Sequence, residues 1–105
     1  MAFIYIQEFP GSSQVVNYVG MAPQAEWPPI GSQKVAFAAP SAKLGATTRV
    51  VRLTCDAICS YVVSRGPPAS GVTVAAAATD ARLAAGAVEY LAVQPGSVIA
   101  AITNT

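Results

Sequence analysis

Short apolar runs, interrupted at close intervals by proline and glycine, constrain the fold of this chain more than any other feature. The 105 residues include 8 Gly and 8 Pro, and no helix-period segment longer than about ten residues stands out. Turn signals recur every 8–12 residues or so between runs rich in β-branched and aromatic residues. The sequence therefore predicts one all-β domain over residues 1–105, a jelly-roll-like antiparallel β-sandwich of about seven to eight short strands.

The C-terminal stretch 82–103, RLAAGAVEYLAVQPGSVIAAIT, predicts a closing hairpin. Residues 88–93 alternate as a strand does, and residues 98–102 form a second apolar run. Between them, Pro95 presets φ for the first central position of a turn, and Gly96 accepts a positive φ at the second. We expect the two strands to pair antiparallel and a second layer to cover them, because the hairpin is apolar.

Further strands are expected along the chain. Residues 3–9, FIYIQEF, are predicted to form a strand whose two faces are both largely apolar. One face is therefore expected to meet the core and the other a partner. Residues 47–55, TTRVVRLTC, place Val51, Leu53 and Cys55 on one face. Residues 57–63 resume as a strand that can pair with its predecessor. Residues 33–38 are a strand, and residues 72–78 either a strand or a surface excursion.

Residues 10–32 are predicted to form an extended, Pro-rich N-terminal arm. Residues 14–20 can form a short strand. Residues 21–31, MAPQAEWPPIG, contain three prolines, which exclude a helix interior and a central strand, so we expect an ordered, extended loop. The only tryptophan, Trp27, is either a core anchor for this loop or an exposed contact for a partner.

The chain is unusually poor in charge. Charged residues make up 10% and the net charge is +1, whereas soluble domains carry roughly 25% charged residues. A compact, Ala-rich domain would have this composition, and so would a protein whose surface lies largely against a partner. A nucleic-acid partner is not expected, because the cations are scattered rather than clustered.

No membrane segment or signal peptide is expected, since the most apolar run, residues 72–78, is far shorter than the roughly 20 residues of a spanning helix. We therefore expect a cytosol-like reducing environment. There, Cys55 and Cys59 are expected to be free thiols that serve as small apolar residues.

The residues offer little catalytic chemistry. The chain has no histidine, so a serine or cysteine nucleophile lacks its usual base, and no four-ligand metal site can be assembled. The five carboxylates show no spacing typical of paired-acid chemistry. We expect a protein that is not an enzyme and that needs no cofactor or metal.

Two segments carry a resemblance to a known family. TTRVVRLTCDAICSYVV and TDARLAAGAVEYLAVQPGSVIAAITNT resemble small structural proteins of tailed bacteriophages, over about the last 60 residues. The resemblance implies a jelly-roll cement (decoration) protein of the capsid, made in the host cytoplasm and bound to the outer surface of the virion head. It implies the major capsid protein as partner, together with other copies of the chain in a dimer or trimer.

We expect the first strand and the Pro-rich arm, residues 3–30, to supply the partner contacts. Edge strands with apolar outer faces invite strand addition. The candidate partner-binding residues are Phe3, Tyr5, Phe9 and Trp27. The alternatives are a carbohydrate-binding or tail- and fibre-associated β-sandwich module, and a cytosolic domain of unrelated function.

Overall fold

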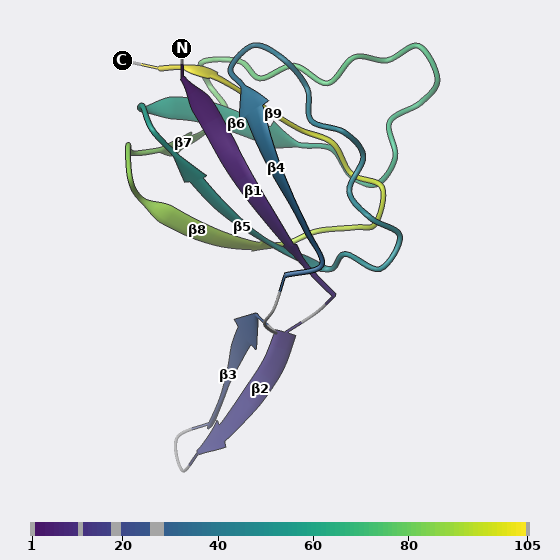
Figure 1. Cartoon of the computed structure of the whole chain (residues 1–105), viewed down its shortest axis with the longest axis vertical. Helices are drawn as coiled ribbons and strands as arrows, with labels where there is room; N and C mark the ends of the chain where they lie inside the picture. The colour runs from purple at the N-terminus through teal and green to yellow at the C-terminus, as the bar shows by residue number, and fades with distance from the viewer. Residues whose placement is uncertain (1, 11, 18–19, 26–28, 105) are drawn as a thin grey trace.

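The structure is a computed structural model that describes residues 2–10, 12–17, 20–25 and 29–104. In these residues it has strands and no helix: seven strands lie in two antiparallel sheets and two form a separate hairpin (Figure 1). The all-β expectation is therefore confirmed, and no described helix is long and apolar enough to cross a membrane. The strands are β1 (Phe3–Phe9), β2 (Ser12–Asn17), β3 (Gly20–Ala25), β4 (Gly31–Ala36), β5 (Val50–Cys55), β6 (Cys59–Val63), β7 (Ala81–Leu83), β8 (Val88–Ala92) and β9 (Ile99–Thr103).

The two sheets enclose one apolar core. The four-stranded sheet has the order β4-β1-β5-β8, and the three-stranded sheet has the order β7-β6-β9. Alternation along β1 and β5 turns one set of side chains inward, as the sequence predicted. Burial of each large apolar side chain contributes about 1.5–3 kcal/mol, so this shared interior holds the sheets together. The core residues are Ile4, Ile6, Val35, Leu44, Val51, Leu53, Cys55, Cys59, Tyr61, Leu83, Ile99 and Ala101.

The predicted closing hairpin is wrong in its pairing, although its turn is present. Gly96 has a φ of +80°, and the amide of Ser97 donates to the carbonyl of Gln94 at 3.2 Å. However, β8 pairs with β5, and β9 pairs with β6 in the other sheet. The Pro-Gly turn therefore begins a crossing between sheets. Burial explains why the two strands lie in different sheets. Val98 to Ala101 are at most 5% exposed, whereas β8 is largely exposed, so the two strands need different surroundings.

β5 and β6 also do not pair with each other. Instead β5 pairs with β8 and β6 pairs with β7, so the chain forms a long ribbon that bends from one sheet into the other. The bend is held by the amide of Gly86, which donates to the carbonyl of Cys55 at 2.8 Å. Residues 72–78, between β6 and β7, form no strand; Val72 is 58% exposed.

The segment after β4 joins the sheets at the opposite side. Ala38, with a φ of +68°, redirects the chain, and its amide donates to the carbonyl of Ala101 at 2.7 Å. The Ser41 amide donates to the carbonyl of Ile99 at 2.8 Å, and the Ser41 hydroxyl accepts from the Ile99 amide at 2.9 Å. This segment therefore lies along β9 and covers that edge of the three-stranded sheet.

β2 and β3 pair as a β-hairpin, where a short strand was expected over residues 14–20 and an extended loop over residues 21–31. β2 and β3 pair only with each other among the described strands, and Figure 1 shows them projecting from the sandwich beyond the ends of β1 and β4. Pro23 lies opposite Gln14. Proline is excluded from central strands, and a two-stranded hairpin has no central strand. Pro23 can therefore lie within β3. Trp27 lies outside the described residues.

Candidate docking face of the four-stranded sheet

The outer face of the four-stranded sheet gathers side chains that point away from the core. The strand register sets them in rows: Tyr5 lies between Lys34 and Thr54, and Gln7 lies between Ser32 and Arg52. The second row continues onto β8, where Arg52 lies opposite Tyr90. We call this surface the docking face; its residues are Phe3, Tyr5, Gln7, Ser32, Lys34, Arg52, Thr54, Val88 and Tyr90.

Aromatic rings and cations contact each other on this face. The Lys34 ammonium nitrogen lies 4.3 Å from the centroid of the Phe3 ring and 6.0 Å from that of Tyr5. An exposed cation–π contact of this kind contributes about 0.5–1 kcal/mol. Arg52 donates from Nη1 to the Gln7 amide oxygen at 3.2 Å. These contacts hold the long side chains of Lys34 and Arg52 in place on the outer face of the sheet.

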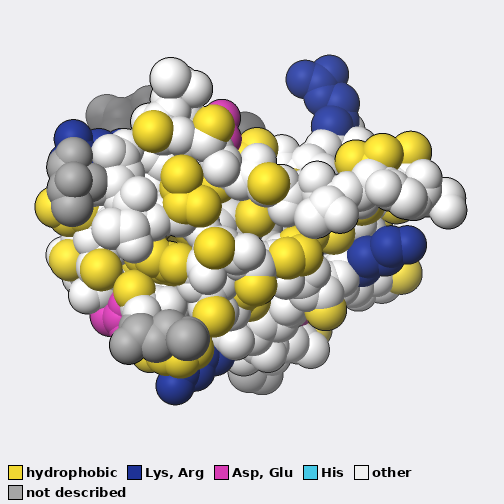
Figure 2. All heavy atoms as spheres, turned by 90° about the horizontal axis from the view of Figure 1, so that it is seen from above, with side chains coloured by type: hydrophobic (Ala, Val, Ile, Leu, Met, Phe, Trp, Pro, Cys, Tyr) yellow, Lys and Arg dark blue, Asp and Glu magenta, His cyan; other side chains and the backbone are white. Residues whose placement is uncertain are grey.

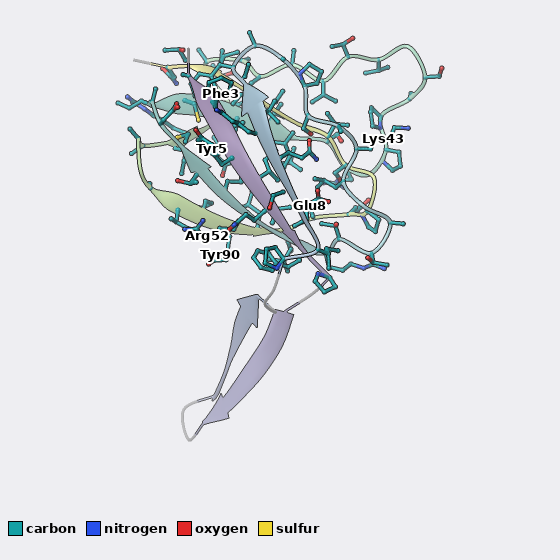
Figure 3. All side chains as sticks on the ribbon, viewed as in Figure 1. Phe3, Tyr5, Glu8, Lys43, Arg52 and Tyr90 are labelled. Atoms are coloured by element: carbon teal, nitrogen blue, oxygen red, sulfur yellow. The ribbon has the colours of Figure 1, made fainter. Side chains whose placement is uncertain are left out.

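The centre of the docking face is an open hollow of about 450 Å³. Tyr5, Gln7, Lys34, Arg52 and Thr54 are among its lining residues. Beside it, Tyr90 is 50% exposed and Val88 is 44% exposed, and Figure 3 shows Arg52 and Tyr90 close together on this side of the sandwich. Tyrosine and arginine are the residue types enriched where binding energy concentrates.

Among the described residues, the docking face carries positive charge without a carboxylate to oppose it. Its charged side chains are Lys34 and Arg52. Asp56 stands at the rim, just beyond β5, where it accepts a hydrogen bond from the amide of Phe3 at 2.9 Å. Glu89 lies opposite Leu53, in the set of β8 residues directed to the other face of the sheet, and Glu8 is buried at 7% exposure. An acidic partner surface would therefore complement this face.

The predicted partner-binding residues separate in the structure. Phe3 and Tyr5 lie half-buried on the docking face, but Phe9 is 0% exposed and is not accessible as an anchor in the free chain. Trp27 lies outside the described residues. Sequence reasoning missed Tyr90, which lies on the same sheet face as Tyr5 but two strands away, beyond β5. The alternation of residues 88–93 indicated a strand, but not that this strand pairs with β5.

A second group of polar contacts fixes the loop that follows β4. The Glu8 carboxylate accepts hydrogen bonds from the Gly45 amide at 2.8 Å and the Thr48 hydroxyl at 2.9 Å, both on Oε1. Gln33 donates to the other oxygen at 3.4 Å. Thr48 is fully buried, so this group is a structural clamp between β1 and residues 45–48. No described group of three or more Cys, Asp or Glu side chains could hold a metal ion.

The two cysteines are free thiols buried in the core. Burial, reinforced by a hydrogen bond with Cys55, raises the pKa of the Cys59 thiol from 9.0 to about 12. We expect Cys59 to react with iodoacetamide roughly a thousandfold more slowly than an ordinary thiol at pH 8, because the thiolate is the reactive form. Mass spectrometry of the native protein tests this, with the unfolded protein as the fast-reacting control; rapid native labelling of Cys59 would contradict it.

The same pKa shift has a consequence for stability. A thiol pKa that is higher in the folded protein favours folding fully below pH 9, and this contribution is lost as pH rises toward 12. Burial also raises the pKa of Tyr61, in the same direction. The midpoint of thermal unfolding is therefore expected to fall as the pH is raised from 9.

Compared with known proteins, the chain matches no family model, no curated protein and no solved structure.

Proposed function

We propose that this protein is a non-enzymatic capsid decoration (cement) protein of a tailed bacteriophage, which binds the outer surface of the head through the docking face. The observation that carries the proposal is the group of Tyr5, Tyr90 and Arg52, joined by Lys34, on the outer face of the four-stranded sheet, where Tyr90 and Lys34 are exposed and Tyr5 and Arg52 are half-buried. Aromatic and arginine side chains gathered on an open sheet face suit a protein partner. The resemblance of residues 47–63 and 79–105 to phage structural proteins points to the capsid.

The sandwich is proposed to be of the jelly-roll type. The supporting feature is the bent ribbon, in which the β5–β8 and β6–β7 pairs are nested and span both sheets. A rolled ribbon of antiparallel strands is how jelly rolls form two facing sheets. The strand count in the sheets, seven, lies within the expected range of about seven to eight.

A decoration protein needs many modest contacts rather than one tight site. Copies on a lattice bind with avidity, so each contact can be weak. Figure 2 shows a side of the molecule on which apolar side chains lie among uncharged atoms, with the charged side chains mainly toward its margin. The docking face and the projecting β2–β3 hairpin are two separate surfaces, and two surfaces allow one copy to bridge neighbouring major capsid subunits.

The first test is a count of this protein in purified particles by quantitative mass spectrometry. We expect copies in number comparable to the major capsid protein. A few copies per particle would place the protein in the neck or tail, and absence from particles would refute the capsid proposal.

The second test is a charge reversal on the docking face. Arg52→Glu is expected to weaken binding to particles that lack the protein about tenfold or more, since it opposes an acidic partner surface and removes the bond to Gln7. The matched control is Arg82→Glu, the same charge change on β7 of the other sheet. Equal binding by both variants, with unchanged circular dichroism, would exclude the docking face as the contact.

A carbohydrate-binding, fibre-associated module is the second candidate. The hollow favours it, because Tyr5 lies beside the polar groups of Gln7, Ser32 and Thr54, and aromatic faces with nearby hydrogen-bonding groups suit sugar rings. Salt distinguishes the two: binding to an acidic protein surface weakens with ionic strength, whereas binding to a neutral glycan does not.

A further inference from the structure

β8 leaves one edge of the four-stranded sheet open. The other end strand, β4, has the following loop beside it: the Ala42 amide donates to the Gln33 side-chain oxygen at 3.0 Å, and the Gln33 amide donates back to the Ala42 carbonyl at 3.3 Å. In the three-stranded sheet β7 has only three residues, and β9 is covered by residues 38–44. β8 is therefore the longest uncovered edge of the two-sheet sandwich, and it contains no proline or lysine of the kind that blocks strand addition.

The backbone groups on this edge can be identified from one hydrogen bond. The Val93 amide donates to the Arg49 carbonyl at 2.8 Å, so Val93 and every second residue before it direct their backbone groups toward β5. The amides and carbonyls of Val88, Tyr90 and Ala92 then point away from the sheet. No described residue pairs with them, and they form a regular row of donors and acceptors at the surface.

A second copy of the chain offers the complementary row. For two β8 strands related by a twofold axis, one register pairs the whole strand: Tyr90 faces Tyr90 of the second copy, and Val88 faces Ala92. Residues with outward backbone groups then meet as hydrogen-bonded pairs, each exchanging both N–H···O bonds. The same register sets Glu89 opposite Leu91.

The neighbouring registers are less favourable. Shifting the axis to residue 89 sets Glu89 opposite Glu89, and like charges directly opposite each other destabilise a strand pair. Shifting it to residue 91 leaves Val88 beyond the end of the partner strand. The whole-strand register also covers exposed apolar surface, since Val88 and Tyr90 are 44% and 50% exposed, and it pairs two aromatic side chains.

We propose that two copies of this chain form a dimer by antiparallel pairing of β8 with β8, which joins the two four-stranded sheets into one eight-stranded sheet. Tyr90 lies at the twofold axis, and the two docking faces become one continuous surface. The dimer forms in solution without any particle, so its test is separate from that of the capsid proposal.

Analytical ultracentrifugation over a range of concentrations tests the proposal. The wild-type chain is expected at twice its mass of 10.7 kDa, and Tyr90→Pro at the single mass. Proline removes an amide that points to solvent in the monomer, so the fold is expected to persist. Tyr90→Ala keeps that amide and is expected to dimerise more weakly than wild type but more tightly than the proline variant. A monomeric or trimeric wild type, or a dimeric Tyr90→Pro, would overturn the proposal.

A crosslinking variant gives a result that does not depend on the proline variant folding. Directly opposed residues of a hydrogen-bonded pair have Cα atoms about 5.5 Å apart, within the range of a disulfide. Tyr90→Cys is therefore expected to form a covalent dimer under mild oxidation by oxidised glutathione. Glu89→Cys, which faces Leu91 of the other copy, is the control and is expected to remain uncrosslinked. Equal crosslinking of both variants would refute this register.

Discussion

Glu8→Ala is expected to lower the free energy of unfolding by about 3 kcal/mol. The carboxylate accepts the buried hydroxyl of Thr48 and the amide of Gly45. Removing it leaves the buried Thr48 hydroxyl without its acceptor, and an unsatisfied buried donor costs about 1–3 kcal/mol, whereas water can replace the carboxylate at the exposed Gly45 amide. The Glu8 carboxylate also packs closely against β4: a Cβ added at Gly31 would lie 2.9 Å from Glu8 Oε2.

Urea unfolding followed by circular dichroism measures this effect. Gln7→Ala is the matched control, since Gln7 is the preceding residue on the same strand but lies on the outer face, and we expect it to lose under about 1 kcal/mol. Glu8→Gln keeps an acceptor and should fall between the two. If Glu8→Ala lost no more than Gln7→Ala, the clamp between β1 and residues 45–48 would be energetically unimportant.

Leu53→Ala is expected to destabilise the protein by about 3–4 kcal/mol. Leu53 is fully buried on β5, the strand between β1 and β8, and belongs to the core that both sheets share. Truncating it removes transfer free energy and leaves a cavity that strands paired on both sides cannot close. Val72→Ala, at a site 58% exposed, is the control and should change stability by about 0.5 kcal/mol or less.

The same urea titrations give the result, with the slope of the transition compared as well as its midpoint. An unchanged slope shows that the difference lies in stability rather than in the compactness of the unfolded chain. A loss below about 1 kcal/mol for Leu53→Ala would mean that the sandwich interior relaxes around the deletion, which contradicts a well-packed core between the two sheets.

Local pattern predicted individual strands better than their partners. Alternation in residues 3–9 and 47–55 located β1 and β5 and identified which side chains face the core. The turn at Pro95 and Gly96 was also predicted correctly. The two strands that flank this turn were predicted to pair with each other, because a tight turn usually connects the two strands of a hairpin. The burial of β9 between β6 and residues 38–44 is a tertiary effect, and no local signal in residues 94–98 reports it.

For the same reason, the sequence indicated the outward position of some residues on this sheet face and not of others. Phe3 and Tyr5 were identified from one strand alone. Tyr90 lies on the same sheet face as Phe3 and Tyr5 because β5 pairs with both β1 and β8. This arrangement depends on which strands pair, and the separation of these residues along the sequence does not indicate it. Phe9 shares the alternation of Phe3 and Tyr5 yet is fully buried, because alternation fixes the direction of a side chain but not what covers it.

The β2–β3 hairpin is inserted between two strands that are already neighbours. β1 and β4 pair as far as Glu8 and Gly31, and the Ile30 amide donates to the Glu8 carbonyl at 2.7 Å, which closes the base of the insertion. A loop of any length could leave and re-enter at this point, since each doubling of its length costs only about 0.6 kcal/mol in closure entropy. The protein thus has a tolerant site for grafting: foreign peptides placed between residues 10 and 29 would be displayed at the end of the molecule while the sandwich keeps its own strand pairing.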